Sequence, residues 1–223
     1  MPVCKTKGDS EQIVKYMIMD IKETMNQAVA VLRSGGLLLY PTDTVWGLGC
    51  DATDPEAVAK IFALKKREDS KSLVLLASDL DMVARYIKEI PEMAVQLVEV
   101  NDQPMTIIYP GAIASVRPEA GQQPVKDRHL LAYNTVAADG TVGIRIPMMD
   151  FCVDLVRRFG CPIVSTSANI SGEPTPKNFR EISQVIKDGV DYIVDPALEN
   201  TATGKSSSII KVGLDATIEI IRK

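Results

Sequence analysis

The chain has 223 residues, of which 46% are hydrophobic and 24% are charged. These values are typical of globular proteins, and they exclude an intrinsically disordered or fibrous protein. The formal net charge of −4 and the sequence pI of about 5.2 provide no overall positive field for a polyanion, so any contact with nucleic acid requires a local basic patch.

The cysteines predict neither a metal site nor a redox motif. Cys4, Cys50, Cys152 and Cys161 are widely separated, and His129 is the only histidine that could join them in a zinc site. Scattered thiols are typical of a reducing compartment. The chain shows no signal-peptide core and no apolar run approaching the roughly 20 residues of a membrane helix. We therefore expect a cytoplasmic protein with no membrane segment and no metal-ligating residues.

Hydrophobic periodicity predicts helices that alternate with strands in the first half of the chain. The expected helices occupy residues 20–34, 55–67, 78–87 and 91–100, and the expected strands occupy residues 37–40, 72–77 and 105–109. Asp20 and Asp54 are suited to cap the first two helices, because an aspartate side chain accepts hydrogen bonds from the free N–H groups of a first turn. Between Pro110 and Asp139 no periodicity persists, and a loop of that length is usually functional or mobile. Both interpretations of that loop remain open.

The second half of the chain contains a strand with a charged residue inside it. Arg145 interrupts the apolar run of residues 142–147, and an unpaired buried charge is very costly, so this arginine needs an anion or a carboxylate as its partner. Asp150 and Asn178 are the expected caps of two further helices. The expected helices occupy residues 150–160 and 178–189, and the expected strands occupy residues 162–164, 192–194, 208–212 and 217–221.

These elements predict an α+β fold, close to the α/β class, with helices flanking a twisted sheet of mixed parallel and antiparallel strands. Helices and strands alternate early in the chain, whereas strand follows strand at its end. No repeat and no linker is evident. We therefore expect residues 20–223 to form one domain, preceded by an N-terminal extension at residues 1–19.

The stretch at residues 37–51 combines a buried strand with a polar exit. Its apolar run ends at Pro41, which cannot donate to a strand ladder. The exit contains Thr42, Asp43, Thr44, Trp46, Gly47 and Gly49. Glycine lets a backbone approach a ligand and threonine hydroxyls both donate and accept hydrogen bonds, so the exit could line a small-molecule site. A plain turn is the alternative, with Trp46 packed in the core.

Five polar clusters fall at expected ends of strands or helices. They are Thr42–Thr44, Lys65 with Arg67, Arg145, Ser167 with Asn169, and Lys205–Ser208. Each cluster alone is explained by a cap, a turn or the helix dipole. Together they supply cations for phosphates and hydroxyls for the rest of a nucleotide, and open sheets place such groups at strand ends. The common phosphate loop, the dinucleotide fingerprint and the His-Glu-x-x-His motif do not occur.

Four motifs resemble those of the YrdC-like threonylcarbamoyl-AMP synthases of the short bacterial type. They are Tyr-Pro-Thr-Asp-Thr-Val-Trp-Gly-Leu-Gly at 40–49, Lys-x-Arg at 65–67, Gly-Ile-Arg-Ile-Pro at 143–147 and Ser-Thr-Ser-Ala-Asn-Ile-Ser-Gly at 165–172. Four motifs in one order, over nearly the whole chain, make the resemblance specific. It implies a YrdC-like fold and a nucleotidyltransferase that makes threonylcarbamoyl-AMP and pyrophosphate from L-threonine, bicarbonate and ATP, with Mg²⁺. A tRNA-modifying threonylcarbamoyl transferase complex would take the product, and tRNA or double-stranded RNA is a further implied partner.

The resemblance also assigns roles to residues. Lys65 and Arg67 would be catalytic. The implied nucleotide-binding residues are Lys65, Arg67, Lys71, Thr106, Arg145, Ser167, Asn169 and Arg222, and the implied threonine-binding residues are Thr42, Thr44, Gly143 and Ser207. The chain departs from the family pattern at Glu68, where proline is common, and after Arg222, where Pro-Gly usually follows. If a nucleotide binds, residues 110–139 are a candidate lid over it.

Two other functions remain open. An RNA-binding module acting in translation or ribosome maturation would use the basic residues 65–67 and would bind RNA tightly, with a steep salt dependence and no ATP turnover. A carbamoyl-transfer domain of the hydrogenase-maturation type shares the motifs, although it normally lies in a much larger chain that carries zinc-finger cysteines.

Overall fold

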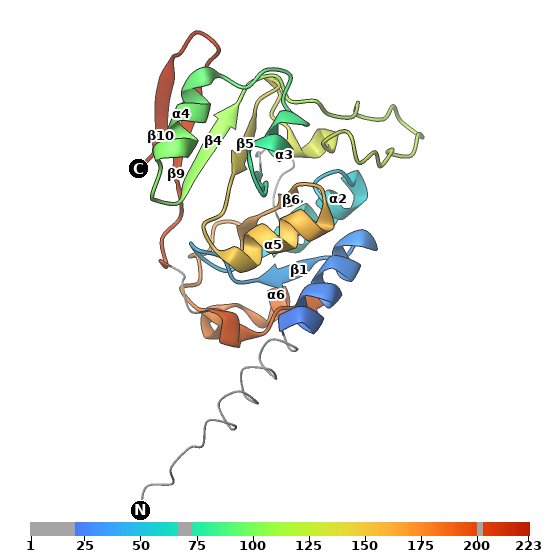
Figure 1. The fold of residues 1–223 in the computed structure, drawn as a ribbon. Helices are drawn as coiled ribbons and strands as arrows, with labels where there is room; N and C mark the ends of the chain where they lie inside the picture. Colours follow the sequence, from blue (N-terminus) through green and yellow to red (C-terminus); the bar gives the residue numbers. More distant parts are fainter. Residues whose placement is uncertain (1–20, 67–72, 200–202) are drawn as a thin grey trace, which may run out of the picture.

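The strands form two hydrogen-bonded sheets in the computed structural model, which describes residues 21–66, 73–199 and 203–223 (Figure 1). The strands are β1 (Leu38–Tyr40), β2 (Gly47–Gly49), β3 (Val74–Leu76), β4 (Met105–Tyr109), β5 (Val142–Arg145), β6 (Ile163–Val164), β7 (Thr166–Ser167), β8 (Tyr192–Ile193), β9 (Ser208–Val212) and β10 (Ile218–Arg222). The smaller sheet has the order β7-β2-β1-β8, and the larger sheet has the order β10-β9-β4-β5-β3-β6. Parallel pairs, such as β3 with β5 and β4 with β9, occur beside antiparallel ones. The expected mixed α+β fold is confirmed.

Helices cover both sheets. Residues 21–33 are helical, and the other helices are α2 (Pro55–Lys65), α3 (Leu80–Ala84), α4 (Glu92–Val100), α5 (Asp150–Phe159) and α6 (Gln184–Asp188), with 3₁₀ turns η1 (Tyr133–Thr135), η2 (Phe179–Glu181) and η3 (Pro196–Leu198). Helix α4 lies over the larger sheet, because its Val98 lines a small cavity together with Tyr109 of β4 and Ile144 of β5. Among the described residues, no helix is both long and apolar enough to cross a membrane.

One short segment, residues 163–167, contributes a strand to each of the two sheets. Its first part, β6, pairs with β3 in the larger sheet, and its second part, β7, pairs with β2 in the smaller sheet. Only Ser165 separates the two strands. The amide of Val164 also donates to the carbonyl of Cys50, at 2.9 Å. The polar ends of strands from both sheets therefore meet at this junction.

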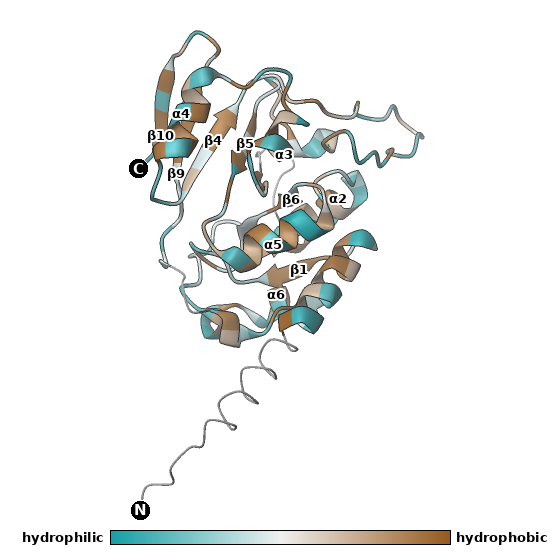
Figure 2. Ribbon diagram, viewed as in Figure 1, coloured by the Kyte–Doolittle hydropathy of each residue, from teal (hydrophilic) through white to brown (hydrophobic). Residues whose placement is uncertain are grey.

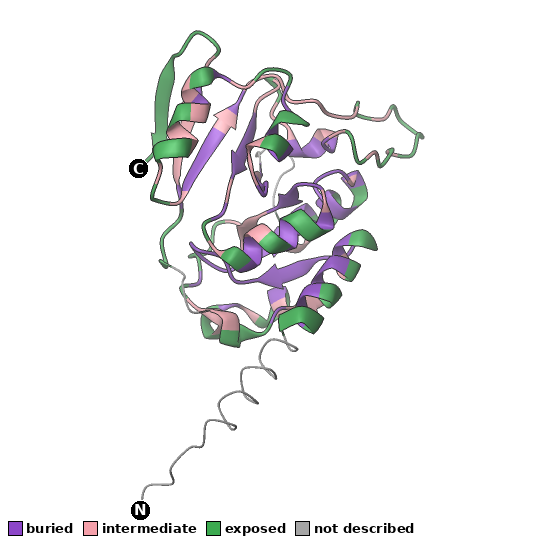
Figure 3. Cartoon of the chain, in the orientation of Figure 1, coloured by how far each residue is buried: buried purple, intermediate pink, exposed green. Residues whose placement is uncertain are grey.

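The apolar faces that periodicity predicted are mostly buried. Figure 2 shows the polar outer face of α5, and Figure 3 shows β1, β4 and β5 almost wholly buried, in contrast to β10. The buried residues of α5 include Phe151, Leu155, Val156 and Phe159, as expected. Ile21 and Val185 belong to these apolar faces, yet their exposed fractions are 40% and 57%. Val185 faces solvent because the helix expected over residues 178–189 is divided into η2 and α6.

The expected helix caps were partly correct. Asp54 caps α2, since its carboxylate accepts hydrogen bonds from the amides of Glu56 and Ala57 at 3.0 and 3.2 Å. Asn178 caps η2 in the same way. Asp150 is wrong as a cap, because it is the first residue of α5 and the cap position is held by Met149 without a side-chain hydrogen bond. Residues 1–20, which include the expected extension 1–19 and the cap Asp20, lie outside the described residues.

Strands β2 and β7 were not expected from the sequence. Each has only two or three residues, with glycine, serine and threonine in place of alternating apolar residues. Their strand character comes from pairing, since β2 is hydrogen-bonded to β1 on one side and to β7 on the other. A pattern of period two cannot indicate segments so short.

The loop at residues 110–139 packs against the chain that follows α3 and the chain that precedes α2. Ala112 pairs with Ile87, and Ala114 pairs with Leu131 within the loop. Lys126 forms ion pairs with the carboxylates of Asp51 and Asp54 at 2.8 and 3.1 Å. In Figure 1 the loop extends on the side of the molecule opposite to the β9–β10 hairpin.

We expect Gly49→Ala to destabilise the protein, because a methyl group at this position would lie 2.6 Å from the carbonyl oxygen of Val164 and 2.8 Å from the ring of Tyr40. Overpacking of this kind costs about 1–3 kcal/mol in the free energy of unfolding. Urea denaturation measures the loss. Gly47→Ala is the matched control, since its nearest contacts would be 3.2 Å to a ring, and it should cost less. Equal losses for both variants would contradict this packing.

Candidate functional site

A cavity of about 250 Å³ lies where the two sheets meet. Its walls come from the β1–β2 turn, the start of β3, the end of β5, the β6–β7 junction, the chain before β9 and the end of β10. The lining residues are Thr42, Thr44, Val45, Trp46, Gly47, Leu73, Val74, Arg145, Ser165, Thr166, Ser167, Ser206, Ser207, Ile209 and Arg222. Six residues that sequence analysis assigned to a site are therefore brought together, namely Thr42, Thr44, Arg145, Ser167, Ser207 and Arg222.

No residue of the 110–139 loop lines the described cavity, so its geometry does not support the expected lid.

The hydroxyls of Thr42 and Thr44 form a small network at one wall. The Thr42 hydroxyl donates to the carbonyl of Val45 at 2.6 Å and accepts from the amide of Thr44 at 3.1 Å. The two hydroxyl oxygens are 2.9 Å apart, so the Thr44 hydroxyl donates to Thr42. Thr42 thus shapes the turn, whereas Thr44 retains an acceptor lone pair toward the cavity.

Arg145 has the carboxylate partner that its position required. Its Nη1 lies 2.6 Å from Oδ1 of Asp43, and its Nη2 lies 3.4 Å from the hydroxyl of Thr44. The second carboxylate oxygen of Asp43 accepts from the amide of Met148 at 3.3 Å. Arg145 and Asp43 are only 4% and 5% exposed. The ion pair therefore fixes the guanidinium at the cavity wall, with Nη2 on the side of the threonine hydroxyls.

Asp43 was not among the residues assigned to the site. It lies in the polar exit that sequence analysis singled out, yet nothing in the sequence indicates that its partner is Arg145, 102 residues away. Asp43 also lines a second cavity, of about 520 Å³, whereas Arg145 lines the first. The ion pair therefore contributes one residue to each cavity.

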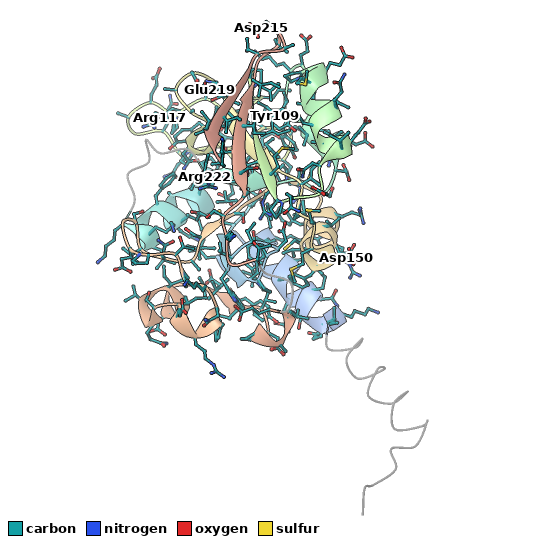
Figure 4. All side chains as sticks on the ribbon, turned by 90° about the vertical axis from the view of Figure 1, so that its left-hand side faces the viewer. Tyr109, Arg117, Asp150, Asp215, Glu219 and Arg222 are labelled. Carbon is teal, nitrogen blue, oxygen red and sulfur yellow. The ribbon has the colours of Figure 1, made fainter. Side chains whose placement is uncertain are left out.

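Ser207 and Arg222 form the opposite wall of the cavity. The guanidinium of Arg222 donates from Nε and Nη2 to the carbonyl of Ser207 at 2.9 and 2.7 Å. The hydroxyl of Ser207 lies 2.7 Å from that of Thr106, which is fully buried in β4. Gly143 faces Thr106, since a methyl group on it would lie 3.4 Å from Cγ2 of Thr106. Thr106 and Gly143 thus support Ser207 from behind and do not line the cavity. Figure 4 shows Arg222 at the inner end of the hairpin, whose tip carries Asp215.

Lys65 and Asn169 lie next to the cavity. Lys65 is 2% exposed, and its ammonium donates to the carbonyls of Ser167 and Asn169. The hydroxyl of Ser167 donates to the side-chain oxygen of Asn169 at 2.5 Å. Two further predicted site residues, Arg67 and Lys71, lie outside the described residues.

Burial disfavours ionisation of three groups that do not line the cavity, namely Tyr40, Cys50 and Cys152. Burial raises the pKa of the Tyr40 hydroxyl far above its usual value, and it does the same for the thiols of Cys50 and Cys152. The ring of Tyr40 packs against Gly47 of β2, and a Cβ atom on Gly47 would lie 3.2 Å from that ring. A thiolate nucleophile at Cys50 or Cys152 is therefore disfavoured.

Trp46 belongs both to the core and to the cavity wall. It is 1% exposed and packs in a small apolar cluster with Leu39, Ala168, Ile182 and Ile186. Its ring centroid lies 5.0 Å from that of Phe179. The expected core packing of Trp46 is confirmed, and one side of it also faces the site.

The described lining of the cavity combines cationic side chains with many hydroxyls. Two guanidinium groups and several serine and threonine hydroxyls face it, and its described lining contains no carboxylate. His129 is not part of that lining. Within the described ranges, no group of three or more His, Cys, Asp or Glu side chains could hold a metal ion. Guanidinium groups are strong donors to the oxygens of phosphate and carboxylate groups.

Comparison with known proteins identifies the family. Residues 30–223 match the family model of the Sua5, YciO and YrdC proteins, which carries the description "Telomere recombination". This chain belongs to that family. It is 31% identical over 169 residues to the threonylcarbamoyl-AMP synthase of Cellvibrio japonicus, covering 76% of this chain and 82% of that protein. It is 32% identical over 174 residues to the threonylcarbamoyl-AMP synthase of Stenotrophomonas maltophilia, covering 77% and 86%.

Solved structures of family members have the same fold. Sua5 of P. abyssi complexed with L-threonine is 26% identical to this chain and superposes with a TM-score of 0.66. The match covers 84% of this chain and 50% of the Sua5 chain, so the present chain spans about half of that protein. YciO of E. coli, also 26% identical, superposes with a TM-score of 0.66 and covers 89% of this chain and 88% of YciO. The resemblance stated from the four motifs is confirmed.

Asp43→Ala should destabilise the protein by about 3 kcal/mol, because removing one partner of a buried ion pair leaves an uncompensated charge. The free energy of unfolding from urea titration measures this loss. The control is Asp139→Ala, which removes an ion pair to Lys211 whose side chains are 54% and 40% exposed. An exposed pair contributes at most about 1 kcal/mol. A loss for Asp43→Ala no larger than that of the control would contradict the role of the pair.

Proposed function

We propose that the chain is an L-threonylcarbamoyladenylate synthase, which makes threonylcarbamoyl-AMP and pyrophosphate from L-threonine, bicarbonate and ATP. The observation that carries the proposal is the convergence of Arg145, Arg222, Ser167, Ser207 and Thr44 on one cavity. The names of the curated relatives and the threonine complex of a solved neighbour support it. A nucleotidyltransferase is the enzyme class that these findings indicate.

The chemistry requires charge neutralisation more than a strong base. The threonine amine and bicarbonate give a carbamate with loss of water, and a carbamate oxygen then attacks the α-phosphorus of ATP while pyrophosphate leaves. Positioning and electrostatic stabilisation supply most of the catalysis in such transfers. In our proposal Arg145 and Arg222 bind phosphate or carboxylate oxygens, together with Arg67 and Lys71 from the segment outside the described residues.

The hydroxyls of the cavity would orient the amino acid. Thr44 and Ser207 both line the cavity, and their hydroxyls contact those of Thr42 and Thr106, respectively. Gly143 packs against Thr106. Ser167 and Asn169 would complete the nucleotide side. We assign the site residues in this way because the hydroxyls have partners within the protein and still expose lone pairs to the cavity.

Mg²⁺ would enter with the nucleotide. The described lining offers hydroxyls and guanidinium groups but no carboxylate, which is the ligand that Mg²⁺ prefers in proteins. The metal would therefore be held mainly by the phosphates of ATP, where it neutralises charge on the leaving pyrophosphate. We further propose that the product passes to a threonylcarbamoyl transferase complex that modifies tRNA in the cytoplasm.

Incubation with ATP-Mg²⁺, L-threonine and labelled bicarbonate should yield labelled threonylcarbamoyl-AMP, and pyrophosphate release should depend on both threonine and bicarbonate. Arg67→Ala and Arg145→Ala should lower kcat/KM by at least about 100-fold, since each removes a cation from the phosphates. Liquid chromatography with mass spectrometry detects the product. Lys211→Ala, on the exposed surface of β9, should keep full activity. Steeply salt-dependent RNA binding without any ATP turnover would replace this proposal by an RNA-binding function.

A further inference from the structure

Lys65 holds one turn of the chain from two sides. Its ammonium donates to the carbonyls of Ser167 and Asn169, the latter at 2.6 Å. Its own carbonyl accepts a hydrogen bond from the amide of Ser171 at 2.9 Å. One residue at the end of α2 thus fixes the backbone of residues 167–171, which are 102 or more positions away in the sequence.

The side chains of this turn are engaged within it. The hydroxyl of Ser167 donates to Oδ1 of Asn169, and Nδ2 of Asn169 donates to the carbonyls of Ile170 and Glu173 at 3.1 and 2.7 Å. Ser167 is the member of the turn that lines the cavity. Its position therefore depends on the carbonyl that Lys65 binds and on the amide oxygen of Asn169.

Lys65 lies beside this turn because it is the last residue of α2. Asp54 caps the start of the helix, and Lys66 ends it with φ 49° in the left-handed region, so the helix stops directly after Lys65. A lysine suits this place better than an arginine, because a compact ammonium directs its three N–H groups to separate carbonyls, whereas a guanidinium is a planar fork. Oδ1 of Asn169 lies 3.5 Å from the ammonium.

We propose that Lys65 is a positioning residue, which acts on the substrate site through the turn 167–171 and not by direct contact with the ATP phosphates. The ammonium already donates to the carbonyls of Ser167 and Asn169 and lies 3.5 Å from Oδ1 of Asn169, so a phosphate oxygen would compete with these acceptors. Holding this turn keeps the Ser167 hydroxyl at the cavity wall. The catalytic part of this inference rests on the proposed function, whereas the structural part can be tested without substrate.

The first test is hydrogen exchange of the ligand-free protein. In Lys65→Met the amides of residues 167–171 should exchange at least about 10-fold faster, because the local opening free energy of the turn falls when its anchor is lost. The matched control is Lys60→Met on the same helix. The ammonium of Lys60 also donates to a backbone carbonyl, that of Gly35 at 2.8 Å, but neither residue lines the cavity. Lys60→Met should leave the exchange rates of the amides of residues 167–171 unchanged. Unchanged exchange of the turn in Lys65→Met would overturn the proposal.

The second test separates positioning from phosphate contact. Loss of a supporting hydrogen bond behind a site typically lowers activity by about 10–100-fold. Lys65→Arg keeps the charge but not the geometry. Its kcat/KM should therefore fall, and the amides of residues 167–171 should exchange as fast as in Lys65→Met. Arginine would serve equally well in a direct phosphate contact. If Lys65→Arg retains near-normal kcat/KM, or if only the KM for ATP rises in Lys65→Met, the proposal is wrong. Should the native protein lack synthase activity, the proposed function fails while the exchange result stands.

Should Lys65→Met be too unstable to purify, Lys65→Arg carries both tests. It keeps a long cationic side chain, and the exchange of residues 167–171 then reports on the carbonyl contacts alone. Faster exchange in Lys65→Arg supports the proposal, and native exchange rates overturn it.

Discussion

The buried ion pair between Asp43 and Arg145 is the interaction on which the site depends. Asp43 follows β1 of the smaller sheet, and Arg145 ends β5 of the larger sheet. Burying two charges is costly unless they are held at close range with further hydrogen bonds, which Thr44 and Met148 provide here. The pair therefore fixes the relative placement of the two sheet edges that form the cavity.

Two other parts of the site also contain a cation whose hydrogen bonds go to backbone carbonyls. Lys65 binds the carbonyls of the turn after β7, and Arg222 binds the carbonyl of Ser207. Each cation thus fixes a backbone segment whose serine, either Ser167 or Ser207, lines the cavity. An anionic substrate would meet a preorganised set of donors, which need little rearrangement during the reaction.

A shared fold does not by itself assign the function of this chain. The HypF protein of one solved nucleotide-bound structure superposes with a TM-score of 0.67 at 21% identity, which indicates a common fold alone. The assignment to a synthase rests instead on the cavity and on the more similar synthases. Arg145, Arg222 and the hydroxyls are brought together on one cavity, and this arrangement is the basis of the proposed nucleotide site.

The sequence by itself determined the long regular elements and the membership of the family. Helix α2 and strands β4 and β9 were predicted because their apolar periodicity and the cap at Asp54 are local properties. The four motifs likewise required only residue identity and order. The expectation that Arg145 needs a carboxylate also followed from the sequence, because the cost of a buried charge does not depend on which partner satisfies it.

Only the tertiary structure decided which residues meet. It selected Asp43 as the partner of Arg145, turned Lys65 toward the carbonyls of residues 167 and 169, and made strands of β2 and β7. It also placed the 110–139 loop away from the described cavity. These features depend on contacts between segments about 100 residues apart, and no local pattern of hydrophobicity or turn residues encodes such pairings.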